Sequence, residues 1–383
     1  MHHLIAKINL MEDPRTGNAK IHKLEDIVFM VIAAVVAGMS TWDEIREFAS
    51  HHREYFSKYL EMPGGVPSAD TFARVFRMLS REGFEDMFRE LIEEFRQMRE
   101  RETGEEAAER NISIDGKTIC GAGKYGKEYN VHVVSAYESE SGLVLGQTRV
   151  EEKSNEVTAI PKLIDSLELK GNTISIDAMG CQKDIARRII EKGAHYVLAV
   201  KKNQGRLLED IEDTAKLEKP DSIYTETSGE HGRVETRTYE LYHELSHISG
   251  AWNWEGLAAV VRVSKESWEK KSGKRTREQR FYIVSNRHAS AQQIAGSIRS
   301  HWGIENSLHW VLDVVFNEDQ GRKRKGNSAE NFSRVLRFAL VLIKQYKARH
   351  EGLKVPLQRL RLRATWDTDV LDDILFGNEL EHK

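Results

Sequence analysis

The sequence predicts an α/β protein in which a sheet-forming region follows an all-helical N-terminal region. Apolar residues recur at helical spacing up to residue 110 and alternate as in strands from residue 111. A β-α-β-α-β succession follows, which requires parallel strands joined by crossover helices. The chain has 383 residues, 40% of them hydrophobic, so it can bury a large core divided over two or three domains.

The N-terminal region is expected to be a bundle of helices. Residues 27–37 are apolar without a break, which suits a buried helix and is too short to span a bilayer. Thr41 and Glu44 have the spacing of a capping box at the start of the next helix. Ser68 is expected to cap a short helix, and a long amphipathic helix then ends in a charged linker before residue 111.

The central region predicts a ribonuclease H-like core. Three strands joined by turns resemble an antiparallel meander, and two further strands alternate with helices. The expected strands are 111–119, 129–139, 143–152, 172–179 and 195–201, with helices over 155–169 and 182–193. Three meander strands that lead into two parallel strands are the plan of a ribonuclease H-like sheet.

The rest of the chain interrupts and then completes that core. Alternating segments at 233–245, 256–267 and 279–287 predict a β-rich insertion. Helical spacing then predicts a single long helix over 291–316 and an amphipathic helix over 329–347. The expected organisation is a helical domain over 1–110, the first part of the core over 111–218, the insertion over 219–288, the rest of the core over 289–350 and a C-terminal tail over 351–383.

Three carboxylates are the candidate catalytic and metal-binding residues. Asp115 and Asp177 end two segments with the same apolar–Ser–apolar–Asp pattern, in strands expected to be neighbours about 4.8 Å apart. Aspartates so close repel each other unless a cation lies between them. Glu305 falls within an apolar helical stripe, where a carboxylate needs a partner. Such an oxygen-ligand set favours Mg²⁺ or Mn²⁺.

Each carboxylate also has a purely structural interpretation. Asp115 could form a turn with the glycine that follows, Asp177 could cap the next helix, and Glu305 could pair with His301 or His309. A phosphate-binding loop at "DGKT" is excluded, because the position five residues before its glycine is Asn111.

The charge distribution permits a local anion-binding face. The net charge is −3, but residues 262–325 hold fourteen Lys and Arg against seven Asp and Glu. Such a basic segment suits nucleic acid, or is simply a solvated helix surface. Two cysteines without metal-type spacing, and no signal-peptide pattern in the first residues, predict a cytoplasmic protein without a membrane anchor.

The chain resembles an Asp-Asp-Glu transposase of the H-repeat-associated insertion-sequence family. The matching segments are "SIDGKT", "EKSNEVTAIPKL", "TISIDAMGCQKDIA", "YVLAVKKNQ", "EHGRVETR" and "SHWGIENSLHWVLDVVFNEDQ", with "DPRTGNAKIHKLEDI" and "PSADTFARVF" near the N-terminus. The resemblance implies that Asp115, Asp177 and Glu305 hold two Mg²⁺ or Mn²⁺ ions. It also implies a homodimer on double-stranded DNA that cuts at the element's terminal inverted repeats and joins the freed 3′-hydroxyls to target DNA.

One motif of the wider transposase group is incomplete. Its helix carries Tyr-x2-Arg-x3-Glu-x6-Lys, and this chain has Ile298, His301, Glu305 and Leu312 at those positions. We expect His301, or alternatively Arg299, to contact phosphate in place of the arginine. Trp302 lies on the apolar stripe and is expected in the core, with base stacking as the alternative.

Basic residues elsewhere are candidate DNA contacts, with a solvated surface as the alternative in each case. They lie on the short N-terminal helix, after the fifth strand, at the "EHGRVETR" segment and at a predicted hairpin tip within the insertion. The candidates are Arg74, Arg77, Lys201, Lys202, His231, Arg233, Lys270, Lys271, Lys274, Arg275 and Arg277. Two functions compete with a transposase: an inactive DNA-binding relic, and a ribonuclease H-like nuclease without strand transfer.

Overall fold

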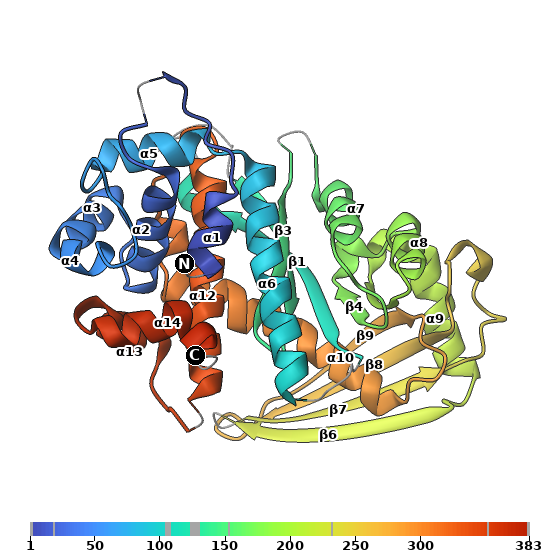
Figure 1. The fold of residues 1–383 in the computed structure, drawn as a ribbon. Helices are drawn as coiled ribbons and strands as arrows, with labels where there is room; N and C mark the ends of the chain where they lie inside the picture. The colour runs from blue at the N-terminus through green and yellow to red at the C-terminus, as the bar shows by residue number, and fades with distance from the viewer. Residues whose placement is uncertain are drawn as a thin grey trace.

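In the computed structural model, helices cover both faces of one mixed sheet of nine strands (Figure 1). The structure describes residues 3–17, 20–103, 109–122, 131–151, 154–230, 233–350 and 352–380. The strand order is β3-β2-β1-β4-β5-β9-β8-β7-β6. The strands are β1 Asn111–Ile119, β2 Val131–Glu138, β3 Leu143–Arg149, β4 Thr173–Ile176, β5 His195–Val200, β6 Ser222–Glu230, β7 Arg233–Tyr242, β8 Ala259–Glu269 and β9 Arg275–Val284.

The helices form a bundle at one end of the molecule and two layers along the sheet (Figure 1). Those of the bundle are α1 His3–Asn9, α2 Leu24–Val36, α3 Trp42–His51, α4 Arg53–Phe56, α5 Ala69–Met78, α6 Arg81–Thr103, α12 Ser328–Arg349, α13 Leu357–Trp366 and α14 Thr368–Leu380. Those along the sheet are α7 Glu156–Ser166, α8 Lys183–Glu191, α9 Gly205–Leu217, α10 Ala291–Ile304 and α11 Trp310–Val314.

The first five strands have the predicted arrangement. β1, β2 and β3 form an antiparallel meander, and β4 pairs in parallel with both β1 and β5. All four residues of β4 are buried, as expected for a strand covered by helices on both faces. α7 packs on β2 and β3, whereas α10 crosses β1, β4 and β5.

The predicted insertion extends this same sheet. β9 pairs antiparallel with β5, and β8, β7 and β6 follow in turn. The strands predicted at 233–245, 256–267 and 279–287 are therefore present, and β6 is an additional strand that the sequence pattern did not indicate. Residues of β9 lie next to the core strand β5, which places the end of the insertion at the centre of the molecule.

The N-terminal and C-terminal helices form one bundle. α12 contacts α2, α5, α6 and α14, and also reaches β2 and β3. The Thr41–Glu44 capping box and the Ser68 cap are both confirmed. The residues expected to form a C-terminal tail fold as α13 and α14, which contact α2. None of the helices in the described ranges is both long and apolar enough to cross a membrane.

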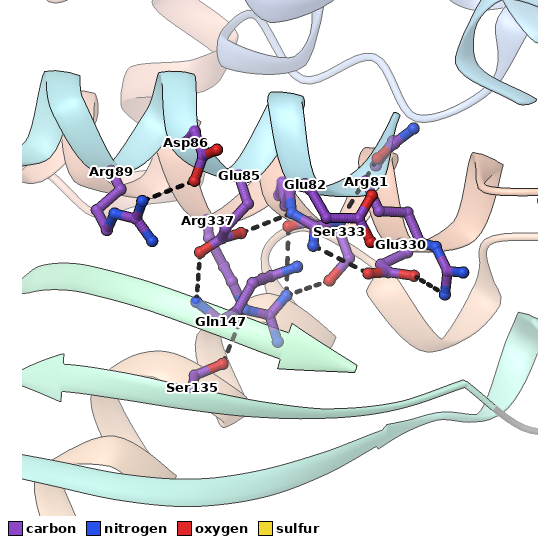
Figure 2. Close-up of polar contacts among 12 residues, drawn as sticks. Arg81, Glu82, Glu85, Asp86, Arg89, Ser135, Gln147, Glu330, Ser333 and Arg337 are labelled. Atoms are coloured by element: carbon purple, nitrogen blue, oxygen red, sulfur yellow. Dashed lines mark hydrogen bonds and ion pairs between the residues drawn. The ribbon is translucent and has the colours of Figure 1, made fainter. Parts of the chain in front are cut away.

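The helix predicted over 329–347 is present, but the prediction that it is amphipathic is wrong in one respect. α12 buries the charged residues Glu330, Arg334 and Arg337 as well as its apolar ones. Arg334 donates to Glu85 of α6 at 2.6 Å and to Glu330 at 2.9 Å. Arg337 donates to Glu318 at 2.7 Å. We call these five residues the α12 charge network; Figure 2 shows part of it between α6, α12 and the strands. It stays buried because each carboxylate meets an arginine.

Candidate active site

The two Ile-Ser-Ile-Asp segments lie side by side in register. Ser113 of β1 is directly opposite Ser175 of β4, and the flanking isoleucines pair in the same way. Asp115 and Asp177 are the next residues on these strands, so the prediction of equal depth in the sheet is confirmed. Asp115 lies within β1, opposite Ser135 of β2. The alternative that Asp115 forms a turn is therefore wrong.

Asp177 follows the last residue of β4 and caps the 3₁₀ turn Ala178–Gly180. Its Oδ1 accepts hydrogen bonds from the backbone N–H groups of Met179 at 2.9 Å and Gly180 at 3.4 Å. Asp177 thus caps this short turn and not the helix predicted over 182–193, which begins after Gln182. The same contacts fix the carboxylate at the end of β4, beside Asp115.

Hydrogen bonds from the sheet fix the end of α10. The backbone carbonyl of Ser300 accepts from Ser113 Oγ at 3.3 Å and from Ser139 Oγ at 2.9 Å. His301 Nδ1 lies 3.2 Å from Ser175 Oγ. The serines of the repeated pattern therefore dock the helix that carries the third carboxylate.

Glu305 begins a π-helical turn, and this corrects the single α-helix predicted over 291–316. α10 ends at Ile304, the π turn spans Glu305–His309, and α11 follows. A π turn contains one more residue than an α turn, which shifts the residues after it around the helix axis. Trp302 and Glu305 of the predicted apolar stripe are exposed, whereas Leu308 and Leu312 are buried. Such turns often occur at functional sites.

Asp115, Asp177 and Glu305 line one cleft of about 810 Å³. Its walls come from β1, β4, β5, β9 and α10. The other lining residues are Ser175, Ile176, Ala178, Val197, Ala199, Val200, Lys201, Lys202, Leu208, Glu212, Glu278, Gln279, Arg280, Phe281, Tyr282, Ile298, His301 and Trp302. The fold thus brings together three carboxylates that are far apart in the sequence.

The cleft is electrostatically unfavourable for its own carboxylates. The pKa of Asp115 is raised to about 7, mainly by burial and also by the negative charges of Asp177, Glu156 and Glu305, against the opposing effect of a hydrogen bond from the Gly116 N–H. The concentration of negative charge favours either a proton or a cation at this position.

The neighbouring histidines do not supply that positive charge. His309 Nδ1 lies 3.4 Å from Asp115 Oδ2, and burial lowers the pKa of His309 to about 3. Burial also lowers the pKa of His301. The hydrogen bonds and ion pairs of the described residues join neither histidine to Glu305. The alternative of an i,i±4 pair with Glu305 is therefore wrong.

The predicted basic residues near the cleft separate into two groups. Lys201 and Lys202 are exposed after β5 and line the cleft, as does His301. Arg299 points instead toward the insertion, where its Nε lies 3.6 Å from Glu226 Oε1 of β6. Of the two candidates for the missing arginine, only His301 is a cleft residue.

The predicted hairpin tip is confirmed as a hairpin between β8 and β9. Gly273 has a φ of +68° in the turn, and the pairing of the two strands runs to Trp268 and Arg275. Its basic residues Lys270, Lys271, Lys274, Arg275 and Arg277 are all exposed. Arg233 is exposed opposite Glu269, near the same tip. Arg74 and Arg77 are exposed on α5, and His231 lies outside the described residues.

Two cleft residues escaped the sequence analysis. Trp302 was expected in the core, but it is 37% exposed and lines the cleft one turn before Glu305, so that prediction is wrong. The Arg280 guanidinium from β9 lies 4.8 Å from the centroid of the Trp302 ring. No pattern indicated Arg280, because only the pairing of β9 with β5 brings it here.

Comparisons with known proteins show the family of this chain. The sequence matches the transposase DDE domain family over residues 102–342, and the family described as DDE_Tnp_1-associated over residues 5–92. The chain belongs to the DDE transposases. The resemblance seen in the sequence motifs is thereby confirmed.

Relatives of this transposase-family chain align over nearly its full length. It is 39% identical to the putative transposase YncI of Escherichia coli O157:H7 over 380 residues, which cover 96% of this chain and 94% of that protein. It is 35% identical to the H repeat-associated putative transposase YhhI of Escherichia coli K12 over 386 residues, 98% of each. A shorter relative, the inactive transposase YbfQ of the same strain, is 35% identical over 72 residues, 19% of this chain and 86% of that protein.

Proposed function

We propose that this chain is the transposase of an insertion sequence, which cleaves DNA at the ends of the element and joins the freed 3′ ends to target DNA. The single observation that carries the proposal is the cleft shared by Asp115, Asp177 and Glu305. Two of these residues extend in register from neighbouring parallel strands, and the third comes from the helix that crosses them. In this proposal, β1–β5 are a ribonuclease H-like catalytic core.

The carboxylates fit Mg²⁺ or Mn²⁺ when DNA is also present. Among the described residues, no three Asp, Glu, His or Cys side chains are close enough together to hold one ion by themselves. Mg²⁺ is usually held by one or two carboxylates, with substrate phosphate and water as the remaining ligands. In this scheme Asp115, Asp177 and Glu305 would hold the ions together with the DNA.

The cleft residues have separable roles in the proposed reaction. Bound ions would supply an activated nucleophile and stabilise the leaving oxygen of an in-line displacement. Asp115, Asp177 and Glu305 would hold the ions, and the ions would offset the repulsion between these carboxylates and the reacting phosphate. Lys201, Lys202 and Arg280 offer positive charge along the DNA backbone on the β5 and β9 sides of the cleft.

Further DNA contacts are proposed outside the cleft. The exposed hairpin tip of the insertion suits a phosphate backbone, because phosphates are recognised by Lys and Arg without regard to sequence. The helical region 1–110 would recognise the element's ends through Arg74 and Arg77 of α5. A homodimer assembled on DNA would hold two ends for joining to one target.

The decisive experiment is incubation of the purified chain with its own element ends, a target plasmid and Mg²⁺, followed by mapping of the 3′ ends. Cleavage at the element boundary with joined products supports the proposal. Cleavage without joining would indicate a nuclease, and binding without cleavage would indicate an inactive relic.

Asp115→Asn, Asp177→Asn and Glu305→Gln test the site itself. Each should lower cleavage by at least about a thousandfold, because it removes an ion ligand, with DNA binding nearly unchanged. Glu168→Gln, an exposed change after α7, is the matched control. Near-normal cleavage by any one of the three would remove that residue from the site.

A further inference from the structure

We propose that Glu156 is a fourth carboxylate of this site, that His132 positions it, and that its charge helps to hold a divalent cation at Asp115. This inference rests on the proposed function, because it concerns the cation held at Asp115, although Glu156 lies outside the residues that line the cleft. Glu156 is the first residue of α7, whereas the other three carboxylates come from β1, the end of β4 and the π turn that follows α10.

The start of α7 lies at the end of the sheet where the two aspartates are. The parallel pairing of β1 with β4 stops at Ile114 and Ile176, immediately before Asp115 and Asp177. α7 contacts the 3₁₀ turn Ala178–Gly180 that Asp177 caps. Glu156 therefore approaches β1 at the level of the site, from the face opposite α10.

Gly116 shows how close that approach is. A Cβ on residue 116 would lie 2.2 Å from Glu156 Oε1 and 2.6 Å from His132 Nε2, distances that no real side chain could tolerate. Only glycine leaves room for a carboxylate against the backbone of the residue after Asp115. The glycine of "DGKT" is thus explained by Glu156 and not by a turn.

His132 fixes the direction of the Glu156 side chain. His132 Nε2 lies 2.6 Å from Glu156 Oε1, and its other ring nitrogen lies 2.8 Å from Thr118 Oγ1. Thr118 and His132 are directly opposite on β1 and β2. A histidine held on one side by a hydroxyl and bound on the other to a carboxylate is a common way to orient groups around a metal ion.

A purely structural role for Glu156 would explain fewer of these observations. A glutamate in the first turn of a helix is stabilised by the helix dipole wherever it points. It would not need a hydrogen-bonded histidine or a bare glycine beneath it. Glu156 instead is half-buried, with 18% of its side chain exposed, and its charge acts on Asp115 together with that of Asp177.

Mn²⁺ binding to the purified full-length chain tests the proposal without relying on catalysis. Free Mn²⁺ is counted by its electron paramagnetic resonance signal. Glu156→Gln should weaken Mn²⁺ binding about tenfold, the lower end of the effects seen for groups that support metal ligands. His132→Gln should weaken it less, because the carboxylate remains. Glu168→Gln, which removes the same charge beyond the other end of α7, should bind as the parent does.

Cleavage provides a second measurement. Glu156→Gln should raise the Mg²⁺ concentration for half-maximal cleavage about tenfold, with most of the rate recovered at saturating Mg²⁺. A residue that only supports the fold would lower the rate at every Mg²⁺ concentration. Should Gln at position 156 prevent folding, as judged by circular dichroism, Glu156→Asp keeps the charge on a shorter side chain and should bind Mn²⁺ with intermediate affinity.

Parent-like Mn²⁺ affinity and Mg²⁺ dependence in Glu156→Gln would overturn the inference. The proposed function fails separately, if Asp115→Asn, Asp177→Asn and Glu305→Gln all cleave DNA normally. Loss of cleavage in those three variants, together with an unaffected Glu156→Gln, would leave the three-carboxylate site intact and exclude the fourth member.

Discussion

Two groups of carboxylates lie on the same face of the sheet and differ in what neutralises them. In the α12 charge network, Arg334 bridges Glu85 and Glu330, and Arg337 binds Glu318. In the cleft, none of Asp115, Asp177 and Glu305 forms an ion pair with a lysine or arginine of the described residues, and the ion-pair partner of Asp115 is the low-pKa His309. The change occurs across one strand pair, since Arg337 donates to Ser135, which lies directly opposite Asp115.

The difference separates structural charge from functional charge. A buried carboxylate that meets an arginine is neutralised by the protein and can be kept in a core. A group of carboxylates without a protein cation holds charge that something outside the chain must neutralise. Burial alone would not distinguish the two groups, because Asp115 is also largely buried, with 20% of its side chain exposed.

The largest expected effect comes from removing a cation from the network. Arg334→Met should lower the free energy of unfolding by about 3–5 kcal/mol, because it leaves Glu85 and Glu330 buried without their shared partner. Urea denaturation measures this change in the free energy of unfolding. Arg322→Met, at an exposed position, is the control and should change stability by less than about 0.5 kcal/mol. A loss below about 1 kcal/mol for Arg334→Met would mean that water neutralises the network.

In the cleft, removing a charge is expected to raise the stability of the protein, whereas in the network it lowers the stability. Asp115 has a folded-state pKa of about 7 against an ordinary 3.8, so its ionised form is destabilised by up to about 4 kcal/mol on folding. Folding therefore takes up a proton between these values, and stability falls as the pH rises toward 7. Without metal, Asp115→Asn should melt above the parent at pH 8, with the difference shrinking toward pH 5. An equal melting temperature of Asp115→Asn and the parent at pH 8 would show that the charge of Asp115 is neutralised in the folded protein.

The tip of the β8–β9 hairpin carries positive charge and belongs neither to the α12 charge network nor to the cleft carboxylates. Changing Lys270, Lys271, Lys274, Arg275 and Arg277 together to Gln should weaken binding to all DNA sequences. The slope of log affinity against log salt should fall by several units, at roughly 0.9 per lost phosphate contact. Gln at Arg187 and Arg188, which are ion-paired on α8, is the control. An unchanged slope would show that the hairpin tip points to solvent.

The smallest expected effect concerns α5. Arg74→Ala should lower the preference for element ends over random DNA by about 1–3 kcal/mol, if this exposed arginine contacts a base. Competition binding at fixed salt measures the ratio. Lys58→Ala, on the exposed surface of the same bundle, should leave the ratio unchanged. If Arg74→Ala also leaves it unchanged, α5 has no part in sequence recognition.

The sequence revealed the pairing of Asp115 with Asp177 because two identical strand patterns in a parallel sheet come into register. It could not reveal the π turn at Glu305, since an extra residue in one turn leaves no mark on the apolar pattern before it. The sequence also could not predict that charged residues of α12 are buried, because the carboxylate that neutralises Arg334 is Glu85, in a helix far away in the sequence. Arg280 and Glu156 reach the site only through strand pairing and helix placement.

The pairing of β9 with β5 has a consequence for engineering of this chain. Without β9, the backbone N–H and C=O groups along one side of β5 would have no partners, and β5 would become the edge of the sheet. An exposed, apolar edge strand is a template for aggregation. Shortening residues 219–288 to a simple loop is therefore expected to give insoluble protein, whereas a version that trims only the β8–β9 tip keeps every strand paired and isolates the role of the hairpin.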